Sequence, residues 1–289
     1  MSASTRSVSR AVYGIQIVVR WPFAGHAAGT EILIGNRAEI RSEEGAELKT
    51  GSRRDVGDVR WPTTDHLQGV LSFMITVVDL AGVVYTAGKV FDGLAVGRRD
   101  TENFLRSGSL AGVSSRADLA LLEDLRDVAQ FVVDHHGQPI DALYVRAINA
   151  QITRRGALHP GQLRTEDQQI GVRTRYGRHS PPALTEDGLQ QLIDSLNCDD
   201  VTENALDLFV ELAKAQPFED GNKRTALFVA NSLLIGRGTL LVVPVDEHDP
   251  QLADTFNDLL AKAYIRDEHD AVKALLRDHG ITVLPRGAQ

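Results

Sequence analysis

The chain has 289 residues, which is long enough for one large domain or for a domain with an appended module. Its formal net charge is −8 and its pI is about 5.6, which argues against nucleic acid as a partner, because contacts to a phosphate backbone need clustered lysines and arginines. Cys198 is the only cysteine, so an intrachain disulfide and a cysteine zinc site are both excluded. The polar residues 1–10 are not followed by the apolar segment of a secretory signal, and we expect a cytoplasmic location.

The first part of the chain gives the weakest structural signal. Residues 11–20 and 31–40 are rich in valine, isoleucine or tyrosine, which favours strands and predicts a small β element in an N-terminal extension. We expect four regions, which are the extension at 1–64, a helical region at 65–114, a core at 115–245 whose bounds rest on a family resemblance described below, and C-terminal helices at 246–289.

Residues 69–88 raise the question of a membrane, because they are apolar over about the length that spans a bilayer. Asp79 lies near their middle, glycines interrupt them, and no cluster of lysine or arginine flanks them. We therefore predict a buried core helix and no membrane contact, and a hairpin that turns at residues 79–82 is the alternative.

From residue 65 onward the spacing of apolar residues predicts a mainly α fold. Ser114 or Ser115 can cap a helix that runs to about His135 and ends at His136 and Gly137. Its apolar residues recur at three- and four-residue spacing and mark one buried face, made of Leu119, Leu121, Leu122, Leu125, Val128, Phe131 and Val132.

The next helix is predicted over residues 140–154, with Leu143, Ile148 and Ile152 facing inward. Residues 156–182 contain glycines, prolines, scattered arginines and short β-prone stretches, a pattern typical of an extended hairpin or loop. Further helices are predicted over residues 185–196, 202–215, 224–234, 250–264 and 271–276.

The segment Q-P-F-E-D-G-N-K-R, residues 216–224, lies between two of these helices. Its glycine lets main-chain N–H groups approach an anion, and the N-terminus of the next helix adds the positive end of its dipole, so the segment predicts a phosphate site. Phe218 would anchor the loop in the core. Asp220 can hold Mg2+, because this hard cation binds one or two carboxylates together with phosphate oxygens. The side chains that can donate to those oxygens are Asn222, Lys223 and Arg224. On residue chemistry alone, a simple turn and helix cap explains the segment equally well.

The string P-F-x-D-G-N-K-R-T-A resembles the signature of the Fic (Fido) family of nucleotide-dependent transferases, His-Pro-Phe-x-Asp/Glu-Gly-Asn-x-Arg, and eight of those nine positions fit. The resemblance covers about residues 86–243 and implies a helical core with a β-hairpin flap. It also implies ATP or a similar nucleotide as co-substrate, Mg2+ at Asp220, and catalytic roles for Gln216, Asp220 and Arg224. The residues expected to bind the nucleotide are Phe218, Gly221, Asn222, Lys223, Arg224 and Asn231.

The segments L-H-P-G-Q-L-R at 158–164, I-G-V at 170–172 and Y-G-R-H-S-P-P at 176–182 resemble the flap of this family. In relatives the flap aligns a target polypeptide by adding a strand to it, so the resemblance implies that a protein or small-molecule acceptor binds at 161–182. The arginines of this region can receive phosphates or an acidic partner, or form a solvated edge, and they are Arg164, Arg173, Arg175 and Arg178.

The sequence departs from the family pattern at two positions of the loop and its helix. Gln216 stands where active relatives carry histidine, and because a neutral amide cannot act as a general base, a rate loss of about 10² to 10⁴ is expected. Leu227 stands where many AMP-transferring relatives carry a second arginine. The ending N-K-R-T-A-L instead resembles the Doc branch, which transfers phosphate. His179 and His159 are candidates for the missing base by residue type.

A third departure concerns self-inhibition, which in many relatives uses a helix reading Ser/Thr-x-x-x-Glu-Gly/Asn. The nearest match is G-K-V-F-D-G at residues 88–93, with Asp92 in place of the glutamate. Aspartate is shorter than glutamate, and Leu227 cannot form an ion pair with it. We therefore expect the inhibitory contact to be absent or rebuilt, and the motif to persist only as helix packing.

Three functions fit these observations. The first is an enzyme that transfers or cleaves a phosphate-containing group, AMPylation-like or by phosphotransfer, and needs Mg2+. The second is an inactive nucleotide-sensing or partner-binding module, which predicts nucleotide binding without turnover. The third is the toxin of a toxin-antitoxin pair, and a homo-oligomer is a further partner to be considered.

Overall fold

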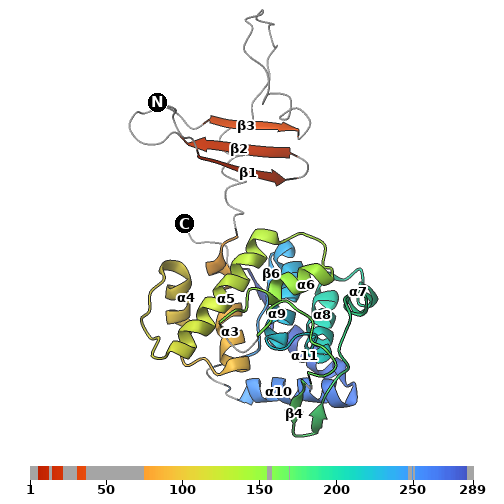
Figure 1. Ribbon diagram of the computed structural model, residues 1–289. Coiled ribbons are helices and arrows are strands. Elements are labelled where there is room, and N and C mark those ends of the chain that lie inside the picture. The colour runs from red at the N-terminus through yellow and green to blue at the C-terminus, as the bar shows by residue number, and fades with distance from the viewer. Residues whose placement is uncertain are drawn as a thin grey trace, which may run out of the picture. The chain divides into compact units, whose positions relative to one another are not determined.

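The computed structural model describes residues 6–12, 15–21, 31–36, 75–154, 158–168, 170–246, 249 and 251–284. The chain divides into two compact units, residues 1–62 and residues 63–289 (Figure 1).

The N-terminal unit contains a three-stranded antiparallel sheet. Its strands are β1 (Arg6–Val12), β2 (Ile15–Trp21) and β3 (Glu31–Asn36), in the order β1-β2-β3. The strands lie in the part of the chain where the sequence predicted β structure, but the stretch predicted at 11–20 is divided between β1 and β2.

The second unit is mainly α, which confirms the predicted fold class (Figure 1). Its helical elements are η1 (Val77–Leu80), α3 (Ala81–Asp92), α4 (Arg98–Ser107), α5 (Arg116–His135), α6 (Ala142–Asn149), α7 (Glu186–Ser195), α8 (Val201–Ala215), α9 (Asn222–Leu234), η2 (Ile235–Arg237), α10 (Gln251–Arg266) and α11 (His269–His279). Two small two-stranded antiparallel sheets complete it. One is the hairpin of β4 (Val172–Thr174) and β5 (Gly177–His179), and the other pairs β6 (Thr239–Leu241) with β7 (Ile281–Val283).

Helix α9 forms the centre of this unit. It contacts α3, α5, α6 and α8, and Leu227, Phe228 and Ala230 are all fully buried. A helix that is covered on several sides buries residues around most of its circumference, and the polar residues Asn231 and Ser232 of α9 are buried with hydrogen bonds to main-chain oxygens. Its N-terminal end therefore has a fixed position relative to the surrounding helices.

The predicted boundaries of α5 are confirmed, because the Ser115 hydroxyl accepts a bond from Asp118 N and the helix ends at His135. The prediction for residues 140–154 was too long, since α6 ends at Asn149. The expectation that Leu143 faces inward was wrong, because Leu143 is 60% exposed. The short helix turns Ala142, Val145 and Ile148 toward the core, and Leu143 points away from them.

The core helix predicted within residues 69–88 is present over the described part, as η1 followed by α3. Residues 69–74 lie outside the described residues. Asp79 does not turn a hairpin; its Oδ2 accepts a bond from Thr76 N at 2.7 Å and caps the start of η1. Within the ranges that the structure covers, no helix is both long and apolar enough to cross a bilayer.

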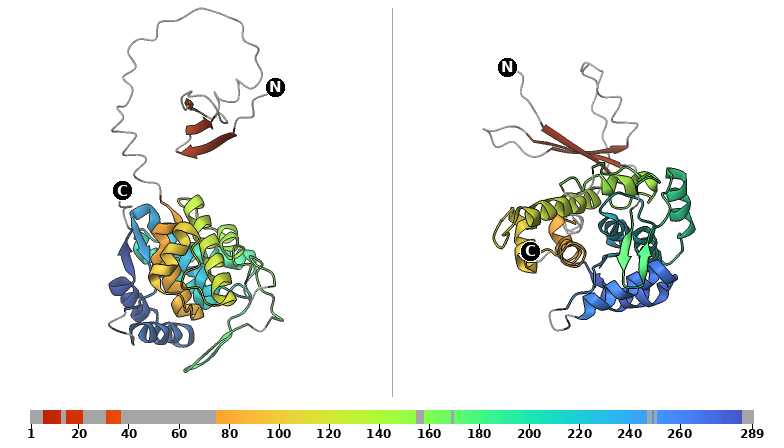
Figure 2. Two further views of the ribbon diagram at one scale, coloured as in Figure 1. Left: turned by 90° about the vertical axis from the view of Figure 1, so that its left-hand side faces the viewer. Right: turned by 60° about the horizontal axis from the view of Figure 1, so that its bottom comes forward.

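The β4–β5 hairpin projects beside α10, and β5 contacts that helix (Figure 2). It occupies the C-terminal part of the region predicted as an extended hairpin or loop, residues 156–182. Hereafter residues 158–182 are called the flap.

Candidate functional site at the N-terminus of α9

The loop between α8 and α9 begins with an unusual backbone conformation. Gln216 follows the last residue of α8 and has φ 49° and ψ 53°, in the left-handed region. Its main-chain N–H bonds to Leu212 O, and its side-chain Nε2 donates to Ala213 O at 3.0 Å. The glutamine amide is therefore folded back onto the end of α8.

The middle of the loop is closed by one side chain. Asn222 Oδ1 accepts from Phe218 N at 2.8 Å, and Asn222 Nδ2 donates to Phe218 O at 2.9 Å. The Phe218 ring is buried in the core, as the sequence predicted for its anchor. Because both ends of the Asn222 amide are used within the loop, this side chain shapes the loop, and the main-chain N–H groups of the first turn of α9 are left without partners inside the helix.

Gly221 precedes α9 and has φ 74°. A Cβ atom at this position would lie 2.5 Å from Ile152 Cδ1, so a larger residue would also collide with the wall of the loop. Glycine is therefore required here both for its conformation and for its size.

Arg224 lies almost completely buried under the loop, with its side chain 4% exposed. Its Nη2 donates to Asp220 Oδ2 at 2.9 Å, and its Nε lies 3.5 Å from Asp92 Oδ2. Arg224 Nη1 is buried and has no hydrogen-bond partner among the described residues. An unsatisfied guanidinium N–H at a helix N-terminus marks the place where an anionic oxygen fits.

Asp92 ends α3, so the contact with Arg224 rebuilds the pairing that Leu227 cannot make. The expectation that the 88–93 motif persists only as helix packing was therefore too narrow, because its acid reaches the arginine of the loop. Leu227 is fully buried in the core.

Lys223 is the next basic group of the loop. Its Nζ lies 4.8 Å from the centre of the Phe91 ring, in a cation–π arrangement. Burial lowers the pKa of Lys223, while the neighbouring Asp92 acts in the opposite direction.

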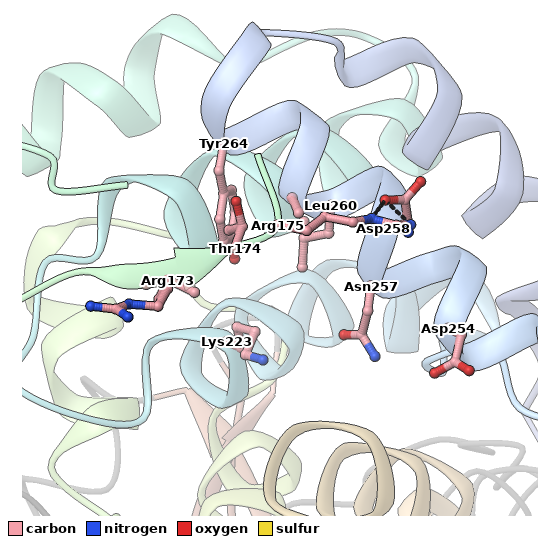
Figure 3. Close-up of a pocket in the computed structure, with 11 residues that line it drawn as sticks. Arg173, Thr174, Arg175, Lys223, Asp254, Asn257, Asp258, Leu260 and Tyr264 are labelled. Atoms are coloured by element: carbon pink, nitrogen blue, oxygen red, sulfur yellow. Dashed lines mark hydrogen bonds and ion pairs between the residues drawn. The ribbon is translucent and has the colours of Figure 1, made fainter. Parts of the chain in front are cut away.

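A cavity of about 440 Å³ opens beside Lys223 (Figure 3). One wall is β4 of the flap and another is α10, which contributes Asn257 and Tyr264. The hydroxyl of Tyr264 is buried without a hydrogen-bond partner in the described part of the chain, and burial raises the pKa of Tyr264 above its usual value. Most of the residues that line the cavity are polar or charged, and its apolar lining comes from Val172, Leu260 and Ala261, so the cavity suits a polar ligand.

The flap is fastened to the loop at both of its ends. Leu163 pairs with Phe218 in an antiparallel bridge, and Arg164 Nε donates to Gln216 O at 2.7 Å. Arg164 Nη2 donates to the carbonyl oxygens of Pro181 and Pro182. The Arg164 side chain is therefore a buried brace between the two flap ends and the loop, and burial lowers its pKa.

Asn149 is a residue of this site that the sequence did not reveal. Its Nδ2 donates to Asp220 O and to Thr225 Oγ1, both at 3.0 Å, and its Oδ1 accepts from Gly161 N at 2.8 Å. One buried amide from α6 thus joins the loop, α9 and the flap. A lone asparagine in an apolar helix gives no signal of such contacts, because its partners are distant in sequence.

We expect Asn149→Ala to lower the free energy of unfolding by about 2–3 kcal/mol, because it leaves buried groups of three elements without partners. Urea denaturation measures this loss. Asn204→Ala is the matched control, since the contact of Asn204 Nδ2 with Asn197 is long at 3.4 Å and exposed. Equal losses in both variants would contradict the role of Asn149.

Three other predicted residues lie elsewhere or are held by other contacts. Asn231 is fully buried and bonds to the main chain of Leu227 and Leu241, so it fastens α9 to β6 and is not brought to the loop. His179 Nε2 donates to Lys214 O at 2.6 Å, and its ring stacks on Tyr264. His159 is exposed, with its Nδ1 3.9 Å from Glu219 Oε2.

No cluster of three histidine, cysteine or acidic side chains that suits a metal occurs in the ranges that the structure describes. Asp220 is 38% exposed at the mouth of the loop. A single accessible carboxylate next to a phosphate site is nevertheless the protein ligand that Mg2+ commonly uses, since water and phosphate oxygens supply the remaining ligands.

A family model described as Fic/DOC family matches residues 139–234, which extend from the approach to α6 through the end of α9. Comparison with curated proteins finds no match. Among solved structures, a Fic domain containing signaling protein from Bacteroides thetaiotaomicron is similar at 19% identity, with 76% of this chain and 84% of that chain covered and a TM-score of 0.49. Fic-1 from C. elegans matches at 17% identity, over 75% of this chain and 71% of that chain, with a TM-score of 0.51.

A third structure is the BepC protein of Bartonella tribocorum with bound AMPPNP, at 17% identity, with 64% of this chain and 98% of that chain covered and a TM-score of 0.38. The similarity to the C. elegans structure shows a shared fold.

Proposed function

Because residues 139–234 match the model of the Fic/DOC family, we propose that the chain is a nucleotide-binding transferase with an altered active site. The family supports a Fic-type transferase in general. The finer proposal is that the protein transfers or cleaves a phosphate-containing group of ATP or a similar nucleotide, with Mg2+ bound.

The observation that carries the proposal is the unsatisfied Nη1 of Arg224. A buried charged donor without an acceptor costs free energy, and a phosphate oxygen at this point would supply the acceptor. The first turn of α9 adds main-chain N–H groups and the positive end of its dipole. The sequence placed Arg224 in a phosphate loop, and its surroundings in the fold support that assignment.

The neighbouring cavity supports a nucleotide over a free phosphate. It borders Lys223 and is large enough for a nucleoside. The amide of Asn257 and the hydroxyl of Tyr264 can exchange hydrogen bonds with the hydroxyl and ring-nitrogen groups of a nucleoside. We assign the phosphates to the α9 N-terminus and the nucleoside to the cavity between β4 and α10.

Asp220 is the proposed ligand of Mg2+, whose chemistry is to neutralise the charge of the phosphate oxygens. In this structure the Asp220 carboxylate bonds to Arg224. When Mg2+ and a nucleotide bind together, this pair would separate, with the carboxylate bound to the metal and the guanidinium bound to a phosphate. Arg224 would hold the phosphate and Lys223 would add a second positive charge beside it.

Titration with ATP and Mg2+ tests the proposal. We expect binding by the wild-type protein and a roughly 10- to 100-fold weaker affinity for Arg224→Ala, since a bond to a charged group contributes about 1.5–3 kcal/mol. Isothermal calorimetry gives the affinities, and melting curves show whether the variant is folded. The control is Arg237→Ala, an exposed arginine in η2. If wild type does not bind, or if the Arg224 variant binds equally well, the phosphate site is contradicted.

An inactive nucleotide-binding module is the second candidate, and the Gln216 side chain favours it. Its amide bonds to Ala213 O and offers no group that can take a proton. This candidate predicts the same affinities without turnover.

A further inference from the structure

The turn of the flap hairpin is fastened to α10 by one carboxylate. Asp258 Oδ1 accepts hydrogen bonds from the Tyr176 hydroxyl and from Arg175 Nε, and both donors belong to the turn between β4 and β5. The other oxygen, Oδ2, lies 3.2 Å from Lys262 Nζ, one turn further along α10. Figure 3 shows the contact between Arg175 and Asp258, which both line the cavity. Hereafter these four residues are called the clasp.

The Tyr176 ring strengthens the clasp. Its centre lies 4.5 Å from the guanidinium carbon of Arg266 and 5.4 Å from that of Arg175, and cations at such distances are attracted to an aromatic face. The bond from the Tyr176 hydroxyl, together with the two basic side chains, holds the pKa of Asp258 well below its usual value, so the carboxylate is charged at neutral pH. The clasp is therefore a network of charges around one carboxylate, and such networks hold their geometry better than single surface ion pairs.

The strand next to the clasp is a wall of the cavity, to which it contributes Val172 and Thr174. A hairpin of two three-residue strands is not stable by itself, so the position of this wall depends on contacts with the rest of the unit. At one end, Val172 pairs with His179, whose ring stacks on Tyr264 with ring centres 5.0 Å apart. At the other end, the clasp is the contact that holds the turn against α10.

We propose that Asp258 is a positioning residue of the nucleoside site, because it holds the flap turn against α10 and so keeps the β4 wall of the cavity in place. This inference rests on the proposed function, which assigns the nucleoside to that cavity. A wall that is fixed beforehand spares the ligand the entropy cost of ordering it. In the described part of the chain, the bonds and ion pairs of Asp258 reach the flap turn and α10 and not the loop at 216–224. Loss of the clasp should therefore affect the nucleoside part of a ligand and not its phosphates.

Two ligands separate this role from a general loss of stability. ATP fills both parts of the proposed site, whereas inorganic tripolyphosphate carries phosphates without a nucleoside. Isothermal calorimetry in the presence of Mg2+ measures both affinities for wild type and for Asp258→Ala. We expect Asp258→Ala to bind ATP roughly tenfold more weakly, since ordering one or two side chains costs about that factor, and to bind tripolyphosphate as tightly as wild type.

Milder variants keep the experiment decisive if Asp258→Ala does not fold, which melting curves show. Tyr176→Phe removes one bond of the clasp, and Tyr176 is not one of the residues that line the cavity, so a smaller loss of ATP affinity is expected from the clasp alone. Asp258→Asn keeps an oxygen that can accept from Tyr176 and should recover part of the affinity. The matched control is Asp207→Ala, which removes a carboxylate that bonds to Lys273 at 2.7 Å between α8 and α11, and it should leave both affinities unchanged.

Equal weakening of ATP and tripolyphosphate in Asp258→Ala, or no weakening of ATP, would overturn the positioning role. So would a loss in Asp258→Ala with none in Tyr176→Phe, because the carboxylate would then contact the nucleotide itself. If wild type binds tripolyphosphate as tightly as ATP, the cavity does not hold the nucleoside, and this inference fails while the phosphate site stands. If wild type binds neither ligand, the proposed function itself fails.

Discussion

The Gln216→His variant is expected to transfer the nucleotide-derived group about 10² to 10⁴ times faster than wild type. This factor is the usual contribution of a general base, and an imidazole can take a proton near neutral pH whereas an amide cannot. The backbone should accept the change, because histidine tolerates the left-handed region better than most residues and Arg164 holds the carbonyl of residue 216 in place.

The measurement uses ATP labelled in the α- or the γ-phosphate with wild type, Gln216→His and Gln216→Ala, each saturated with nucleotide. Transfer of the α label by the histidine variant alone would identify wild type as a disarmed AMP transferase. Transfer by wild type that Gln216→Ala loses would show that glutamine has a working role in the site. If the three proteins bind nucleotide and none transfers either label, the proposal that the protein is an enzyme is contradicted. The remaining candidate is then the inactive nucleotide-binding module.

Local signals in the sequence predicted much of this unit because the elements concerned depend on neighbouring residues. Ser115 caps α5 through a residue three positions away, and the loop at 216–224 carries its own turn-forming glycine. The position of Phe218 in the core also followed from its place in the loop.

The parts that could not be predicted depend on contacts between distant residues. Helix α6 ends early, and the buried carboxylate of Asp124 in α5 accepts the N–H groups of Thr153 and Arg154 just beyond it. Asp124 lies outside residues 140–154, so the residue pattern of that stretch could not predict this contact. The bonds of Asn149 to the loop and the flap could not be predicted either, because these partners are also distant in sequence.

The contact between Asp92 and Arg224 is another contact between distant residues that the sequence could not predict. The sequence showed that the usual partner of the inhibitory acid is replaced by Leu227, but only the fold shows that Asp92 lies within 3.5 Å of the other arginine. A carboxylate at this distance competes with a phosphate for the same guanidinium, so part of the affinity for a nucleotide is opposed by α3.

Replacing Gly221 by alanine should lower the free energy of unfolding by about 2–5 kcal/mol. A residue with a Cβ in the left-handed region costs roughly 1–2 kcal/mol. The new methyl group would also lie 2.5 Å from Ile152 Cδ1, and relief of such overpacking in a filled core costs about 1–3 kcal/mol. Ile152 is only 1% exposed, so its side chain has little room to move.

Two further variants separate these causes in urea denaturation. Gly236→Ala is the matched control, because a Cβ there meets nothing within 4 Å, and it should be nearly neutral. Combining Gly221→Ala with Ile152→Val removes the colliding methyl group but leaves the backbone strain, so it should recover the steric part of the loss relative to Ile152→Val alone. If Gly221→Ala costs no more than Gly236→Ala, the loop does not hold the tight turn that places the N–H groups of α9 around an anion. The phosphate site would then need another explanation, because its donors depend on that turn.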